Sequence, residues 1–231
     1  HRGNFSQHLL SGTTNNILFA SSISNYGNNC AGTTNKLNLL SNKEKQYEIL
    51  REMYTNCEIV MGNLEITNIL NGSDLSFLRS IREVSGYVLI ALNEVDYVPL
   101  ENLRLIRGNT LYDNKYALSV LLNYNKEQPE SQQGIRRLHL MGLLEIIKGA
   151  VYFDSNEYLC FADTINWADL ENKQSPQNVT NKLDFFKSTC KPCHPSCNGH
   201  CWDEGANYCQ KCKSNVLIPP SPSLPITVKT L

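Results

Sequence analysis

A short apolar phrase that recurs three times constrains this chain more than any other feature. Large aliphatic residues stand three positions apart and a glycine closes each copy, in residues 78–86, 100–108 and 140–149. The closing glycines, Gly86, Gly108 and Gly149, lie 22 and then 41 positions apart, close to one and two lengths of a single period. Periods of this size are typical of solenoids, whose repeats stack because none can bury its apolar face alone.

A run rich in β-branched and aromatic residues accompanies each repeat. These runs cover residues 87–92, 116–122 and 150–153, and residues 62–67 form a similar piece upstream. We therefore expect each repeat to supply an apolar turn, a glycine that permits positive φ or close approach, and a strand that stacks in parallel. The alternative is a set of amphipathic helices, because aliphatic residues at i, i+3 and i+6 also suit a helix. Glycine at this spacing, followed by β-rich sequence, favours a mostly β solenoid.

Composition divides the 231-residue chain into four parts. Residues 1–29 contain 13 Ser, Thr or Asn residues and no sustained periodicity, so we predict a disordered leader. Residues 30–189 carry the repeats and form the predicted solenoid domain. Residues 190–212 hold six of the nine cysteines and form a small module. Residues 213–231 hold four of the nine prolines, which indicates an extended or disordered tail.

A capping helix is expected at the start of the solenoid domain. Residues 36–40 are a short strand candidate, and Ser41 and Glu44 have the spacing of a capping box. The residues that follow place one stripe on a helix, namely Tyr47, Leu50 and Tyr54. Such a helix, ending near residue 57, would cover the first repeat, whose core is otherwise exposed.

Charge and motif content favour a binding module over an enzyme. The formal net charge is −1, which gives no reason to expect a nucleic-acid partner. The longest apolar run has about six residues against the roughly 20 that a membrane helix needs, so we expect no membrane span. The sequence begins at His1 without a basic and apolar leader, so we expect any signal peptide to be removed or outside it. No phosphate-binding loop, metalloprotease motif or nucleophile elbow is present, and we expect no cofactor.

Nine cysteines and three glycosylation sequons point to an oxidising, secretory compartment. The sequons begin at Asn4, Asn71 and Asn178. Six cysteines in 23 residues cannot form a hydrophobic core, so disulfides or a metal must hold residues 190–212 together. Zinc is the alternative, because this stretch contains possible tetrahedral ligands at Cys193, His194, Cys197, His200, Cys201, Cys209 and Cys212. Structural zinc ligands usually form two paired knuckles, whereas this spacing is a run of short gaps, which favours disulfides and no metal.

Two bridges are predicted to hold the solenoid domain. A Cys30–Cys57 bridge would pin the first strand to the end of the capping helix, with a loop closure worth on the order of 3 kcal/mol. We also predict a Cys160–Cys190 bridge. An odd number of cysteines leaves one without a partner inside the chain.

Several stretches resemble the epidermal growth factor receptor family. Residues 62–67, 74–78, 83–93, 99–103 and 106–108 are similar to the first L domain of that family. Cys201-Trp202 and Cys209-Gln210 resemble the opening of its furin-like cysteine-rich region, and residues 60–62 and 161–167 resemble the neuregulin-binding branch. Residues 1–29 and those after Gln210 do not resemble the family, and Asp203 stands where it usually has glycine. We therefore expect a truncated receptor without a kinase.

The resemblance implies a right-handed β-helix in a secreted or cell-surface ectodomain that binds a peptide growth factor. It also implies the bridges Cys193–Cys201 and Cys197–Cys209, which leaves Cys212 free to form a covalent dimer. The implied ligand contacts are Leu37, Leu39, Ser41, Asn68, Leu92, Tyr112, Asp113, Leu121 and Leu122. The leucines would bury apolar ligand side chains and Asp113 would pair with a basic residue. For Leu92 and Leu121 the alternative is an ordinary core position.

The sequence thus predicts a soluble receptor ectodomain fragment. We expect it to bind an epidermal-growth-factor-like or neuregulin-like peptide weakly, and to act as a decoy or modulator of intact receptors. The main alternative is a zinc-binding adaptor, and a third is an enzyme whose site is assembled from distant positions.

Overall fold

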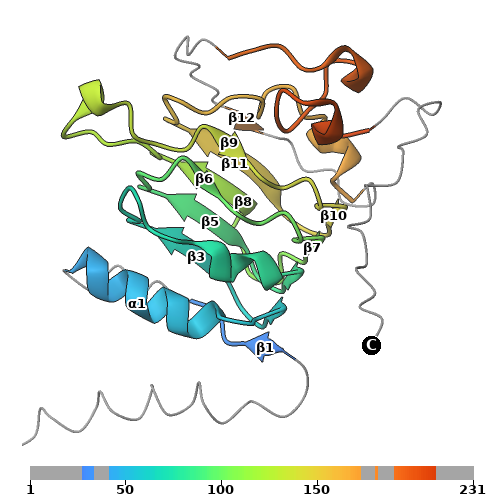
Figure 1. The fold of residues 1–231 in the computed structure, drawn as a ribbon. Helices are drawn as coiled ribbons and strands as arrows, with labels where there is room; N and C mark the ends of the chain where they lie inside the picture. Colours follow the sequence, from blue (N-terminus) through green and yellow to red (C-terminus); the bar gives the residue numbers. More distant parts are fainter. Residues whose placement is uncertain (1–27, 34–41, 173–179, 182–189, 212–231) are drawn as a thin grey trace, which may run out of the picture.

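The structure is a computed structural model that describes residues 28–33, 42–172, 180–181 and 190–211. Nearly all of the predicted leader, the strand at 36–40 and the proline-rich tail lie outside these residues. The described residues are mostly β-structure with one α-helix, as predicted. The helix covers one end of a stack of parallel strands, and the cysteine-rich module lies at the opposite end (Figure 1).

Two parallel five-stranded sheets form the body of the molecule. The first has the order β1-β2-β4-β7-β10, with β1 (Asn29–Cys30), β2 (Ile59–Val60), β4 (Glu83–Val84), β7 (Leu105–Ile106) and β10 (Glu145–Ile146). The second has the order β12-β11-β8-β5-β3, with β3 (Leu64–Thr67), β5 (Val88–Ala91), β8 (Tyr116–Leu121), β11 (Ala150–Asp154) and β12 (Thr180–Asn181). A third ladder pairs β6 (Tyr97–Val98) with β9 (Arg137–Leu138).

Each sequence repeat supplies one strand to each five-stranded sheet. The last aliphatic residues of the three recurring phrases are in register in the first sheet, where Val84 pairs with Ile106 and Ile106 with Ile146. The β-rich runs form the second sheet, where Ile90 lies opposite Val120. The parallel stacking predicted from the period is therefore confirmed. Within the described residues neither sheet closes on itself.

The closing glycines have the two roles expected of them. A side chain at Gly86 would overlap the amide oxygen of Asn63, so this position requires close approach of the backbone. Gly108 has φ +65°, and a side chain there would also overlap the carbonyl oxygen of Lys148.

The capping helix is α1 (Lys43–Tyr54). Its N-cap is Asn42, whose side chain accepts a hydrogen bond from the Lys45 amide at 2.9 Å. The predicted capping box is therefore wrong by one position, because Asn caps as well as Ser; Ser41 itself lies outside the described residues. Gln46 is buried and donates to the Thr67 carbonyl oxygen at the edge of β3. Figure 1 shows α1 alongside β3, so the helix covers the first repeat as expected.

One hydrophobic core fills the space between the two sheets. At its far end Trp167, in the 3₁₀ turn η4 (Trp167–Asp169), packs on Phe153 with ring centroids 5.3 Å apart. The other 3₁₀ turns are η2 (Ser76–Ser80), η3 (Pro129–Ser131), η5 (Pro195–Cys197) and η6 (Ala206–Tyr208). No helix among the described residues has the length and apolar character to cross a bilayer.

Candidate functional site

The outer face of the second sheet carries the candidate site. Ile90 points into the main core, whereas the alternate positions Leu89 and Ala91 belong to a separate small cluster. Tyr112 and Leu121 are only partly buried and pack against this cluster. Side chains are thus buried on both faces of the sheet, and the outer cluster keeps exposed apolar surface.

A hollow of about 670 Å³ opens on this outer face. It is lined by Asn63, Tyr87, Leu111, Tyr112, Asp113, Tyr116, Leu121, Leu122, Tyr152 and Asp154. Four of the nine predicted ligand contacts, Tyr112, Asp113, Leu121 and Leu122, therefore lie together. Leu37, Leu39 and Ser41 lie outside the described residues, so the strand contact implied for them stays a prediction.

Tyrosine rings form much of the wall of this hollow. Tyr87 and Tyr112 meet edge to face with centroids 5.8 Å apart, and Tyr116 stacks on Tyr152 at 4.6 Å. The ammonium group of Lys115 lies 5.1 Å from the Tyr116 ring centroid. Rings that already contact one another present large, rigid surfaces at low entropic cost on binding.

A tight turn places Asp113 at the hollow. Asp113 and Asn114 have φ of 50° and 54°, and the Lys115 amide donates to the Tyr112 carbonyl oxygen at 3.1 Å. Left-handed conformations at both central residues are those of a type I′ turn, and Asp and Asn tolerate them better than most residues do. The turn leaves the Asp113 side chain exposed while it lines the hollow.

Leu92 and Asn68 lie just after the strands, beyond the lining of the hollow. Both are left-handed, with φ of 59° and 58°, and Leu122 repeats the feature at 54°. Because its backbone is left-handed, Leu92 does not follow the alternation of side chains between the two faces of the strand, and it is 44% exposed. The alternative that Leu92 is an ordinary core residue is therefore wrong. Leu121 is only half-buried and packs on the outer cluster.

Two phenols on this face are paired with carboxylates. Tyr87 donates its hydroxyl to the buried Glu65 carboxylate, and Tyr152 donates to Asp154 Oδ2 at 3.0 Å. Burial, together with these carboxylates, raises the pKa of Tyr87 and the pKa of Tyr152. The outer face thus combines neutral aromatic donors with negative charge, an arrangement suited to apolar and cationic side chains of a partner.

A ladder of asparagines, buried at Asn93 and Asn123, fixes the ends of these strands and was not predicted from the sequence. Asn123 Oδ1 accepts from the Asn93 backbone amide and side chain at 3.1 and 2.9 Å. Asn123 Nδ2 donates to the Ile90 carbonyl oxygen and to Asn156 Oδ1, both at 2.9 Å. The signal in the sequence was an asparagine two positions after each β-rich strand, at Asn93, Asn123 and Asn156. In the structure each of them follows the left-handed residue of its repeat.

Eight of the nine cysteines are paired. The bridges are Cys30–Cys57, Cys160–Cys190, Cys193–Cys201 and Cys197–Cys209, the same four pairs that the sequence analysis expects. Their sulfurs are thereby occupied, and no group of three or more His, Cys, Asp or Glu in the described part of the chain is placed to hold a metal. Cys212 lies outside the described residues.

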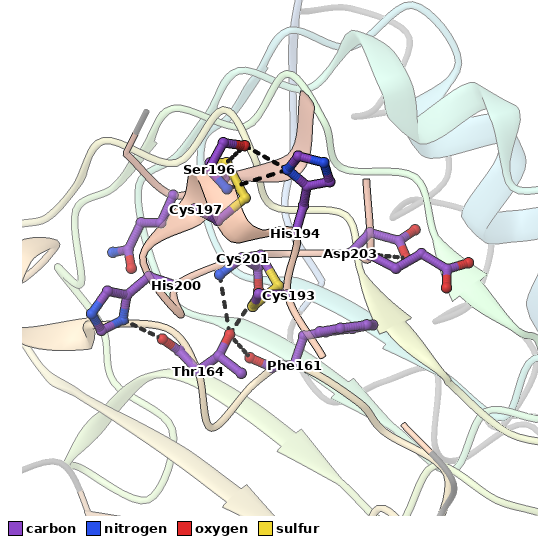
Figure 2. The surroundings of a disulfide bond; sticks show 12 residues. Phe161, Thr164, Cys193, His194, Ser196, Cys197, His200, Cys201 and Asp203 are labelled. Atoms are coloured by element: carbon purple, nitrogen blue, oxygen red, sulfur yellow. Dashed lines mark hydrogen bonds between the residues drawn. A yellow bond between two sulfur atoms is a disulfide. The ribbon is translucent and has the colours of Figure 1, made fainter. Parts of the chain in front are cut away.

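The cysteine-rich module packs on the end of the stack, and Figure 2 shows Thr164 beside Cys201 and His200. Cys201 donates its backbone amide to Thr164 Oγ1 at 3.2 Å, and His200 Nδ1 lies 2.6 Å from the Thr164 carbonyl oxygen. Trp202 is buried edge to face against Trp167. Asp203, the departure from the family pattern, pairs with Arg137 at 2.9 Å. These contacts with Thr164, Trp167 and Arg137 fix the cysteine-rich module to the end of the stack.

Comparison with known proteins gives one consistent answer. The sequence profile of the Receptor L domain family matches residues 56–171. The receptor tyrosine-protein kinase erbB-4 of Mus musculus is 54% identical over 181 residues, which cover 78% of this chain and 14% of that protein. The epidermal growth factor receptor of Gallus gallus is 48% identical over 185 residues, covering 78% of this chain and 26% of that protein. The receptor tyrosine-protein kinase erbB-2 of Rattus norvegicus is 40% identical over 190 residues, with 78% and 15% coverage. The chain therefore spans a small part of these relatives.

Proposed function

The chain belongs to the receptor L domain family, as part of an ectodomain of the epidermal growth factor receptor type, and from this premise we propose that its outer face binds a peptide growth factor. The partner is an epidermal-growth-factor-like or neuregulin-like peptide. The observation that carries the proposal is the hollow on the second sheet, where four of the residues implied by the resemblance line one surface.

The chemistry of that surface supports such a partner. Leu92 is 44% exposed and Leu121 half-buried, so both have apolar area left to cover. Complete burial of a leucine is worth about 1.5–3 kcal/mol, so covering what remains exposed on Leu92 contributes roughly 1 kcal/mol. Asp113 offers a carboxylate to a basic ligand residue, and the tyrosine rings beside it favour the same charge.

We also propose that the repeats close as a right-handed β-helix. The strands β3, β5, β8 and β11 of the second sheet are parallel, and each connection from one to the next passes through a strand of the first sheet. Connections between parallel strands of one sheet are right-handed in about 98% of cases. Right-handed connections at every repeat wind the chain into the right-handed solenoid that the resemblance implies.

Binding is expected to be weak and to serve as a modulating interaction. In the family, two L domains enclose one ligand, and one receptor L domain is matched within these 231 residues. The avidity gain of a second contact, which can reach ~10²–10⁴, is then lost, and a micromolar Kd follows. A secreted chain of this kind would compete with intact receptors for ligand, or contact those receptors directly.

The test is a binding measurement on the purified, disulfide-bonded chain. Calorimetry or surface-binding assays with the two classes of peptide should give a micromolar Kd. Asp113→Asn keeps the left-handed turn and removes only the charge, so it should weaken binding about fivefold, or about 1 kcal/mol. Leu92→Ala should weaken it by a similar factor. Asp163→Asn, an exposed aspartate at the far end of the stack, is the matched control.

Two results would refute the proposal that this face binds a peptide growth factor. One is the absence of binding at high-micromolar peptide, and the other is an unchanged Kd in both Asp113→Asn and Leu92→Ala. Free-thiol counting and metal analysis separate the zinc-binding alternative, which requires bound zinc and several free thiols.

A further inference from the structure

A second hollow lies beside the sequon that begins at Asn71. Asn71 is exposed in the turn after β3, and the next residue, Gly72, has φ +82°. The hollow measures about 440 Å³ and is lined by Asn71, Gly72, Ser73, Asp74, Leu75, Ser76, Arg79, Val95, Asp96, Tyr97 and Pro99. It shares no residue with the hollow on the outer face.

The walls of this second hollow are held in place by surrounding contacts. Tyr97 is 40% exposed and stacks on His139, with ring centroids 4.6 Å apart. His139 Nδ1 in turn lies 3.4 Å from Glu101 Oε1, which also pairs with Arg79 at 3.7 Å. Asp74 accepts hydrogen bonds from Ser76, which lower the pKa of its carboxyl and keep it charged.

We propose that this hollow seats the first sugars of an N-linked glycan on Asn71. In the transfer, Asn71 Nδ2 forms a bond to C1 of the sugar while the bond from C1 to the diphosphate of a lipid-linked oligosaccharide breaks. The amide loses one proton to base. The released lipid diphosphate takes the electron pair of the broken bond.

The chemistry of the walls matches that of a pyranose ring. One face of such a ring carries C–H groups, which pack on the negative face of an aromatic ring, here Tyr97. Its rim carries hydroxyl and amide groups, which pair with charged side chains such as Arg79 and Asp96. A volume of 440 Å³ lies within the range of about 300–1,000 Å³ typical of small-molecule sites. Covalent attachment at the rim gives the sugar a high effective concentration there.

The test uses the full chain secreted from a cell that adds N-linked glycans. Intact-mass and peptide mapping should find a glycan on Asn71, and Ser73→Ala should remove it. Under native conditions, an amidase that cleaves the sugar from asparagine should act about 2- to 10-fold faster on the Asn71 glycan of Tyr97→Ser than on that of the original chain. That ratio corresponds to about 0.4–1.4 kcal/mol of lost contact. Tyr124→Ser, which removes a half-buried tyrosine outside this hollow, is the control and should leave the rate unchanged.

Two outcomes would overturn the proposal. An Asn71 without sugar in a chain that cells have secreted excludes an occupant of this kind. A glycan released at the same rate from the original chain and from Tyr97→Ser shows that the sugar does not use the hollow. The proposal does not depend on growth factor binding.

Discussion

Replacing Asn123 tests how the strand ends that carry the candidate site are held. Asn123 is completely buried, and its side chain makes four hydrogen bonds, to Asn93, Ile90 and Asn156. Asn123→Ala removes all four hydrogen bonds and supplies no polar group in their place. The repeats that carry Asn93 and Asn123 would then lose the side-chain hydrogen bonds that join them in this row.

The expected cost follows from the groups left without partners. The Asn93 backbone amide, one Asn93 side-chain N–H and the Ile90 carbonyl oxygen each lose a bond while buried. An unsatisfied buried polar group costs about 1–3 kcal/mol, so the sum is roughly 3–5 kcal/mol after partial relaxation. That is a large share of the 5–15 kcal/mol typical of a domain.

The measurement is urea unfolding with the disulfides intact, followed by fluorescence of the buried tryptophans. Asn156→Ala is the matched control, because Asn156 makes the same kind of contacts at the partly exposed end of the ladder. Water can replace its bonds, so we expect a loss of about 1 kcal/mol. A loss of less than about 1 kcal/mol for Asn123→Ala, or equal losses for both variants, would refute the reasoning.

Two further predictions concern the ionisation of Glu171 and the state of Cys212. Burial raises the pKa of Glu171, so the folded state binds the proton more tightly than the unfolded state does. This tighter proton binding stabilises the folded state in full below about 4.3, the pKa of the Glu171 carboxyl in the unfolded chain. The stabilisation is lost as pH rises through the higher pKa of the same carboxyl in the folded state. Glu171→Gln should therefore be the more stable form at neutral pH, with a difference that vanishes below about pH 4 in urea titrations; equal stability at every pH would contradict this. Non-reducing gels should show a covalent dimer that Cys212→Ser abolishes, and peptide mapping that finds Cys212 in an intramolecular bridge would overturn that expectation.

Periodicity predicted most of the fold because stacked repeats place equivalent residues in register. Val84, Ile106 and Ile146 could be aligned from the sequence alone, and they form one ladder of the first sheet. The helix start was less well predicted, because Ser41 and Asn42 are both good caps and only the backbone conformation selects between them. The asparagine ladder was missed because a polar residue after a strand usually indicates a surface turn.

The candidate site lies where the repeat is irregular, which explains why periodicity could not find it. After Gly86 the β-rich run begins at once, but after Gly108 seven residues precede Tyr116. These residues fold back through the Asp113–Asn114 turn, so that Tyr112 and Tyr116 exchange backbone hydrogen bonds. A strictly regular repeat would bury the outer face or leave it flat. The extra turn instead adds a tyrosine and a carboxylate above the sheet, and the second sheet is thereby both a structural layer and the floor of the proposed binding surface.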